Sequence, residues 1–246
     1  MVDAAAVEAG IYAGYADDYQ VYKQCTDEPF ALAAALFETV PVFERALDIG
    51  PGDGRLTLEV SRRCRELHFC EPQEALYART SQLLERAGVA ASGSMQAFPC
   101  GVPHGAYDLA LASHMLYFIE RPDWSSFFAA IAECLASSGR VAVILQEARS
   151  ELRQALAESD RWCVAEDLLQ SDSLLSELGL QLEARRSVTP RIKASSVAEA
   201  RAIGRIMFGR EMPERASLRG ERLFERLLHQ GLDNHQSILV YRRHSN

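Results

Sequence analysis

Short apolar runs alternate with longer amphipathic stretches along the middle of the chain. Four runs are mainly apolar and short enough for strands that are buried on both faces, at residues 46–50, 66–70, 107–113 and 140–146. The stretches 73–88 and 125–139 between them have helical spacing, and each closes on a glycine, as helices often do. This alternation predicts an α/β fold with a doubly wound, Rossmann-like sheet.

The two ends of the chain show different patterns. Residues 1–45 predict helices, with Pro29 in a first turn that Thr26 or Asp27 could cap. Beyond residue 146 the pattern predicts a helix, turn and strand over 174–188, two helices, and a last strand at 236–243. We therefore expect one domain over 1–246, made of an N-terminal helical substrate cap (1–45), a cofactor-binding core (46–146) and a C-terminal part (147–246). That last part would close a seven-stranded sheet with an antiparallel pair and lay a helical insertion over the site.

Composition narrows the choice of partners. The net charge of −8 and the pI of about 5.3 argue against nucleic acid or an anionic membrane surface. No apolar run is long enough to span a membrane, and the start lacks the basic region of a signal peptide. The six cysteines are scattered without a Cys-x-x-Cys pair, which favours reduced thiols, no metal and a cytoplasmic protein. We expect a small-molecule enzyme that is a monomer or a weak dimer.

A glycine-rich turn follows the first strand of the alternating region. Gly50, Gly52 and Gly54 stand between that strand and a helix, where glycine permits a tight turn and the helix offers free N–H groups. The dinucleotide fingerprint would place its third glycine at position 55, which is arginine here. With Asp48 two residues before the first glycine, the turn resembles motif I of class I methyltransferases. This resemblance implies S-adenosyl-L-methionine as the cofactor.

The ends of the next two strands add to this predicted cofactor site. Glu71 ends the second strand, 21 residues after Gly50, where a carboxylate can accept hydrogen bonds from both ribose hydroxyls. Pro72 follows it. The polar stretch Ser94, Met95 and Gln96 follows the third strand and is the expected edge for the adenine. An exposed glutamate without the glycine turn would usually be only a solvated charge.

The fourth strand ends in Ser113, which we assign to the cofactor site, and continues into His114, Met115 and Tyr117. Ligands of open α/β sheets bind at the carboxyl ends of strands, although a single histidine there is often structural. The strand lacks the N-P-P-Y or D-P-P-Y sequence of methyltransferases that modify adenine or glutamine. A catechol-type magnesium site would need further acidic residues at strand ends, which are not evident.

These features together resemble histamine N-methyltransferase over nearly the whole chain. The resemblance rests on the following residues in order: Tyr15, Tyr19, Tyr22, Thr26, Glu28, Glu71-Pro72, Met115–Tyr117, 174–180 and Asn234. It implies that Glu28 and Asn234 contact an amine substrate. His114 stands where the family has a glutamine, and it can exchange protons near neutral pH where an amide cannot.

The leading hypothesis is methyl transfer to the nitrogen of a small amine or amino-acid-like substrate. Glu28 would hold its cationic or N–H group, His114 would relay its proton, and Tyr117 would join three N-terminal tyrosines in enclosing positive charge. One alternative is cyclisation of the cofactor's aminocarboxypropyl arm to azetidine-2-carboxylate, with release of methylthioadenosine. Another is a ligand-binding protein without catalysis. Arg191 and Lys193 are candidates for meeting a substrate carboxylate.

Overall fold

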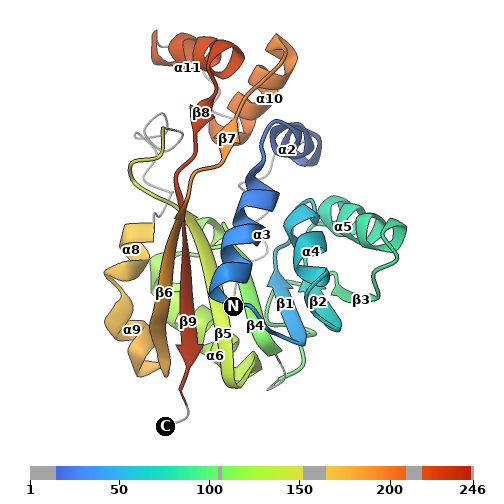
Figure 1. Ribbon diagram of the computed structural model, residues 1–246, viewed down its shortest axis with the longest axis vertical. Helices are drawn as coiled ribbons and strands as arrows, with labels where there is room; N and C mark the ends of the chain where they lie inside the picture. Colours follow the sequence, from blue (N-terminus) through green and yellow to red (C-terminus); the bar gives the residue numbers. More distant parts are fainter. Residues whose placement is uncertain (1–14, 105–106, 152–164, 209–217, 245–246) are drawn as a thin grey trace.

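The computed structural model describes residues 15–104, 107–151, 165–208 and 218–244 (Figure 1). Seven strands form its main sheet: β1 (Arg45–Ile49), β2 (Glu66–Cys70), β3 (Ala91–Ser94), β4 (Tyr107–Ser113), β5 (Leu135–Gln146), β6 (Leu180–Val188) and β9 (Gln236–Arg243). Their order is β3-β2-β1-β4-β5-β9-β6, and β9 runs antiparallel to both of its neighbours. The predicted seven-stranded Rossmann-like sheet, with its closing antiparallel strand, is therefore confirmed.

Helices cover both faces of this sheet. One group packs through Leu32, Leu36, Val60 and Leu84, and consists of α3 (Glu28–Thr39), α4 (Arg55–Ser61) and α5 (Glu74–Arg86). The other group is α6 (Trp124–Cys134), α8 (Ala165–Leu169) and α9 (Asp172–Glu177). In Figure 1, α3 lies in front of the sheet and α6 behind it. The apolar side chains of β5 alternate between the two resulting cores, which is why residues 141–145 of this strand form an uninterrupted apolar run.

A third group of elements lies beyond the carboxyl ends of the parallel strands, at the top of Figure 1. It comprises α2 (Tyr15–Gln24), β7 (Arg191–Ile192), α10 (Val197–Phe208), α11 (Leu218–His229) and β8 (Leu232–Asp233). These elements, which we call the cap, share a hydrophobic cluster of their own around Tyr22, Ile203 and Leu227. The predicted N-terminal helix and C-terminal helical insertion thus pack together over one edge of the sheet.

One predicted helix end is wrong. The sequence predicted a helix running to Gly139 and a strand from 140, but α6 stops at Cys134 and β5 begins at Leu135. Leu135 is fully buried and pairs with Tyr107 of β4, so tertiary packing overrides the helical spacing of the segment. Gly139 belongs to the strand, where a side chain would lie 2.6 Å from the backbone oxygen of Tyr107.

The start of α3 also differs in detail from the prediction. Asp27 is the N-cap residue and Pro29 stands in the first turn, but the Asp27 side chain accepts the N–H of Arg191 in the cap. The hydroxyl of Thr26 accepts the N–H of Glu28 instead, at 3.2 Å. No helix within the described ranges is both long and apolar enough to cross a membrane.

Candidate active site

The glycine turn has the backbone that its sequence predicted. Gly50 and Gly52 have φ values of 71° and 63°, in the left-handed region that side chains rarely adopt. A side chain on Gly50 would lie 2.1 Å from the Sδ of Met115, and one on Gly52 would lie 2.8 Å from the Oη of Tyr19. The turn is therefore in close contact with the segment after β4 and with α2 of the cap.

Asp48 lies beneath this turn. Its carboxyl group is buried and accepts a hydrogen bond of 2.7 Å from the hydroxyl of Thr57 in α4. Burial raises the pKa of Asp48 to about 7, although the Thr57 bond opposes the rise. The only hydrogen-bond partner of this carboxyl group among the described residues is Thr57, so the Asp48 side chain ties β1 to the helix that follows the turn.

Glu71 lies beside the turn at the end of β2. Its two carboxyl oxygens accept the N–H groups of Gly52 and Gln73, at 3.3 and 3.1 Å, and burial raises its pKa to about 7. The N–H of Glu71 in turn donates to the carbonyl of Ser94, at 3.0 Å. Pro72 is half-buried next to Glu71, whereas Met95 and Gln96 are exposed. The structure thus brings the residues predicted around the ribose and adenine to one edge of the sheet.

His114 follows Ser113 in a strained conformation. Its φ of 58° is the only positive value of a non-glycine residue in the part of the chain described. The N–H of His114 donates to the carbonyl of Ile144, which fixes this backbone. Its Nδ1 lies 3.0 Å from the hydroxyl of Tyr117, and that hydroxyl accepts the N–H of Gln146 at 2.9 Å. A strained residue held in this way is typical of functional sites.

The other ring nitrogen of His114 faces Glu28. Its Nε2 lies 3.7 Å from Oε1 of Glu28 and has no hydrogen-bond partner among the described residues. Burial lowers the pKa of His114 to about 4, against the attraction of the Glu28 charge. The imidazole is therefore neutral at physiological pH.

Glu28 is the centre of a buried polar cluster. Only 1% of it is exposed, and its oxygens accept hydrogen bonds from Tyr22 (3.0 Å), Gln236 (3.0 Å), Asn234 (3.4 Å) and Lys23. Burial alone would raise its pKa, but the charge of Lys23, the charge that His114 gains when it is protonated below about pH 4, and the bonds from Lys23 and Gln236 hold it at about 2. The predicted pair Glu28 and Asn234 is thus brought together across 206 positions of sequence.

Several members of this cluster were not predicted. Gln146 ends β5 and donates to Asn234 at 3.1 Å, and Ser150 donates to the same oxygen at 3.0 Å. Gln146 and Gln236 are partners in the register of β5 and β9. A glutamine directly after the apolar run 141–145 is a signal that could have identified Gln146. Lys23 carries no such signal in the sequence.

The tyrosines of α2 connect the two parts of the site. Tyr19 lies against Gly52 and is near enough to Asp53, Glu28 and Glu71 for their charges to add to burial in raising its pKa. Tyr22 bonds to Glu28. Tyr15 begins α2, but its side chain lies outside the described residues.

The remaining candidates lie apart from this cluster. Arg191 and Lys193 are both exposed, and the guanidinium of Arg191 donates to the carbonyl of Gln230. Among the described residues, no group of three or more histidine, cysteine, aspartate or glutamate residues is placed to hold a metal ion.

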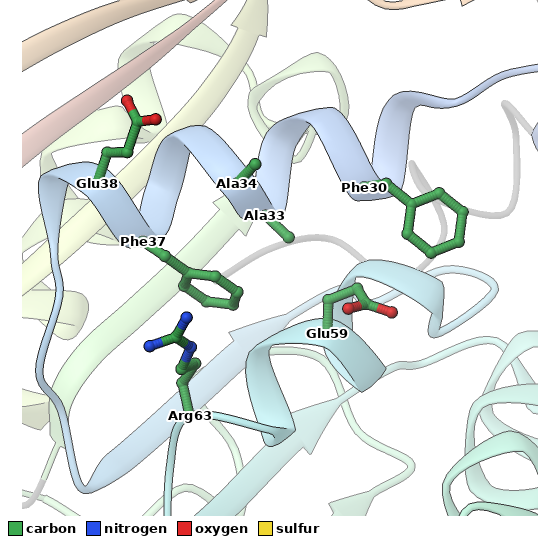
Figure 2. A pocket seen from close by; sticks show the side chains of 7 residues that line it. All are labelled: Phe30, Ala33, Ala34, Phe37, Glu38, Glu59 and Arg63. Carbon is green, nitrogen blue, oxygen red and sulfur yellow. The ribbon is translucent and has the colours of Figure 1, made fainter.

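A separate groove of about 410 Å³ lies between α3 and α4 (Figure 2). Phe30 and Phe37 of α3 line it together with Glu59 of α4, and the guanidinium of Arg63 lies 5.0 Å from the centre of the Phe37 ring. None of its lining residues belongs to the glycine turn or to the Glu28 cluster. Helix α3 therefore contributes Glu28 to the buried polar cluster and other residues to this groove.

Comparison with known proteins places this geometry in context. Residues 46–139 match the family described as methyltransferase domain. No curated protein matches the chain in sequence. The matched residues 46–139 include the glycine turn, Glu71 and His114.

Solved structures share the fold at low identity. One is the 1,6-didemethyltoxoflavin-N1-methyltransferase of Burkholderia thailandensis, with bound 1,6-didemethyltoxoflavin and S-adenosylhomocysteine; its TM-score is 0.62 at 15% identity, covering 98% of this chain and 89% of that one. The N-methyltransferase NodS of Bradyrhizobium japonicum WM9, in complex with S-adenosyl-L-homocysteine, has a TM-score of 0.54 at 13% identity, covering 85% and 84%. The [4+2]-cyclase SpnF has a TM-score of 0.57 at 19% identity, covering 87% and 80%.

Proposed function

From the methyltransferase domain over residues 46–139 and the Rossmann-like methyltransferase fold, we propose that this protein is an S-adenosyl-L-methionine-dependent N-methyltransferase. Its acceptor would be a small amine or amino-acid-like molecule. The observation that carries this proposal is His114, a neutral histidine at the carboxyl end of β4. Its Nε2 is buried without a partner among the described residues, one residue away from the Met115 side chain that contacts the glycine turn.

The residues around the turn fit the proposed cofactor. Each oxygen of Glu71 accepts one backbone N–H, which leaves each with acceptor capacity for a ribose hydroxyl. Burial keeps the pKa of this carboxyl near 7, and hydroxyl donors would favour its charged form. Gly50, Gly52 and Gly54 would let the ligand approach the backbone, while Ser94, Met95 and Gln96 would border the adenine. Asp48, Pro72 and Ser113 complete the proposed cofactor residues.

His114 would hold the acceptor nitrogen. S-adenosylmethionine supplies a methyl group on a positively charged sulfur, which leaves as a neutral thioether when that nitrogen attacks in line. With its ring proton on Nδ1, His114 donates to Tyr117, and its Nε2 can accept an N–H of the acceptor. Tyr117 positions the ring through its second bond, to the N–H of Gln146. A buried, neutral surrounding favours the uncharged amine, which is the form that can attack.

Glu28 would act with this histidine through its charge and position. A donor N–H placed between Nε2 of His114 and Oε1 of Glu28 would relieve the contact of these two acceptors at 3.7 Å. Tyr19 and Tyr22 would shield the reaction from water, and Asn234 would keep Glu28 in place.

Cyclisation of the aminocarboxypropyl arm is the second candidate. It is favoured by the crowding of Glu28, whose Oε2 already accepts three donors of the chain and whose Oε1 accepts Lys23, so that a separate ammonium group finds one acceptor position there. This reaction would consume S-adenosylmethionine alone and give azetidine-2-carboxylate and methylthioadenosine.

Mass spectrometry of the purified protein separates the two reactions. We expect no turnover of S-adenosylmethionine alone, and S-adenosylhomocysteine together with a methylated product once an acceptor from an amine and amino-acid panel is added. Methylthioadenosine with an azetidine amino acid, formed without an acceptor, would overturn methyl transfer in favour of cyclisation. No product under either condition would refute both reactions.

The role of His114 is tested on the active reaction. We expect His114→Ala to lower kcat about a hundredfold with little change in KM for the cofactor, because the ring that holds the reacting nitrogen is lost. His104→Ala is the matched control, since the side chain of His104 is 75% exposed. A kcat of His114→Ala within about threefold of wild type would remove His114 from the chemistry.

A further inference from the structure

The pairing of Glu28 with Lys23 changes what its carboxylate can bind. A carboxylate offers about four lone-pair positions to hydrogen-bond donors. In Glu28, Oε2 accepts Tyr22, Asn234 and Gln236, whereas the donor that Oε1 accepts among the described residues is Lys23. Oε1, which faces His114, therefore keeps one acceptor position, which is too few for the three N–H donors of a ligand ammonium.

The charges of the cluster also cancel. Lys23 and Glu28 have side-chain exposures of 9% and 1%, so both charges of the ion pair are withdrawn from water. His114 adds none, because burial keeps it neutral. Asp53, the acidic residue next to Gly52, is paired with Arg55 at 2.7 Å. A simple ammonium ion therefore finds little net negative charge around Glu28 to offset its loss of water.

Lys23, in contrast, has donors to spare. An ammonium group has three N–H donors, and the one hydrogen-bond acceptor found for Lys23 among the described residues is Glu28. Its other neighbours are the rings of Tyr19 and Tyr22, whose centres lie 5.4 and 5.5 Å from Nζ. A buried ammonium with unused donors is a binding position for an anion.

The position of Lys23 places this binding position within the proposed site. Tyr19, one helical turn earlier on α2, touches Gly52 of the glycine turn. Glu28, which binds Lys23, lies 3.7 Å from the Nε2 of His114. The amide oxygen of Gln146 is buried without a partner among the described residues, and it supplies an acceptor for N–H groups in the same cluster.

We propose that Lys23 binds a ligand carboxylate, so that the substrate of this site is an amine that also carries a carboxylate. This inference rests on the proposed function and names its substrate class. The carboxylate can belong to a separate amino acid or to the cofactor's own aminocarboxypropyl arm. Recognition of the amine then falls to His114 and Gln146, and Lys23 discriminates against amines that lack the acid group.

The composition of the chain makes this directly measurable. Lys23 and Lys193 are its only two lysines, and Lys193 is exposed. Nuclear magnetic resonance of protein labelled with ¹⁵N-lysine will therefore show at most two side-chain Nζ signals, with that of Lys193 as an internal reference. The probes are the common L-amino acids and the matched amines that lack the carboxylate, such as L-histidine with histamine and L-alanine with ethylamine, each added to the protein saturated with S-adenosylhomocysteine.

We expect at least one amino acid to shift the Lys23 signal and leave that of Lys193 unchanged. It should bind about tenfold or more tightly than its matched amine, as the loss of a charge-assisted hydrogen bond predicts. If S-adenosylhomocysteine alone shifts the Lys23 signal, and methylthioadenosine, which lacks the amino acid arm, does not, the carboxylate is that of the cofactor. If S-adenosylhomocysteine leaves the Lys23 signal unshifted, equal responses to amines and amino acids, or no response to any carboxylate, overturn the proposal.

Variants give a second measurement. Lys23→Arg keeps the charge and should retain the preference for the acid, whereas Lys23→Met should reduce it to within about twofold; Lys193→Met is the matched control. The wild-type resonance experiment stands even where Lys23→Met does not fold. It needs no turnover, so a failure of methyl transfer and a failure of carboxylate binding are seen separately.

Discussion

Tyr19 of the cap packs directly against Gly52 of the glycine turn. The hydroxyl of Tyr19 would lie 2.8 Å from a side chain at position 52, and Gly52 has a φ of 63°. The same glycine donates its N–H to Glu71. Gly52 thus forms part of the turn, donates a hydrogen bond to the carboxylate of the proposed ribose site and contacts a tyrosine of α2.

We therefore expect Gly52→Ala to weaken binding of S-adenosylhomocysteine by tenfold or more, measured by calorimetry. Gly88→Ala is a close control, because Gly88 has a similar φ of 70° but open space around it. That control should lose about 1 kcal/mol of stability from backbone strain and keep its affinity for the ligand. Equal losses of affinity in both variants would show that the turn does not hold the cofactor.

Residue types at strand ends could be predicted from the sequence, but their pairing could not. The spacing of the strands indicated that Glu71 and His114 lie at one edge of the sheet, and the glycine turn takes up the expected backbone. Lys23, Gln146 and Gln236 were missed. The partners Glu28 and Gln236 are 208 positions apart, so only the packing of α3 against the start of β9 brings them together.

At the scale of elements, α2 is held from two sides. Asp18 forms two bonds of 2.6 and 2.5 Å with the guanidinium of Arg205 in α10. Asp17 pairs with Arg79 of α5 on the other side. Because Asp18 is buried and Asp17 is 80% exposed, the tie to α10 should contribute most to the position of α2.

This difference predicts the effect of two matched substitutions. We expect Asp18→Asn to speed amide hydrogen exchange within residues 15–24 by tenfold or more and to weaken ligand binding, because an amide cannot satisfy the guanidinium as a carboxylate does. Asp17→Asn should change the exchange by no more than about twofold. Similar exchange in the two variants would mean that the Arg205 pair does not position α2.

Element types were predictable because most of them depend on local patterns. The wrong end of α6 shows the limit of such patterns. Residues 135–139 continue the helical spacing. Pairing with β4 and full burial of Leu135 nevertheless stabilise this segment as a strand more than a further helical turn would.

At the scale of the whole molecule, the buried carboxyl groups set the dependence of stability on pH. The folded pKa values of Asp48 and Glu71, raised to about 7 by burial, exceed their ordinary values of 3.8 and 4.5. Their stabilising effect is complete below those ordinary values and is lost as the pH rises towards 7. Glu28 acts in the opposite sense, since its pKa of about 2 makes it stabilising above pH 4.5 and less so as the pH falls towards 2. Stability without ligand should therefore peak on the acidic side of neutrality.

Asp48→Asn tests this expectation. The variant should lose less free energy of unfolding than wild type between pH 4 and pH 7, by a few kcal/mol, at about 1.4 kcal/mol for each pH unit of the raised pKa. Denaturant unfolding at several pH values gives the comparison, with exposed Asp123→Asn as the control. Parallel pH profiles for wild type and Asp48→Asn would exclude Asp48 as the titrating group.

The placement of Tyr19 and Lys23 on one helix has a thermodynamic consequence. Tyr19 contacts the glycine turn and Lys23 contacts Glu28. If the cofactor and the proposed acceptor both order α2, the one that binds first lowers the entropic cost of ordering this helix for the one that binds second. The two affinities then become reciprocal: the factor by which the cofactor strengthens binding of the acceptor is the factor by which the acceptor strengthens binding of the cofactor. A helix shared in this way would make binding of the cofactor and of the proposed acceptor cooperative.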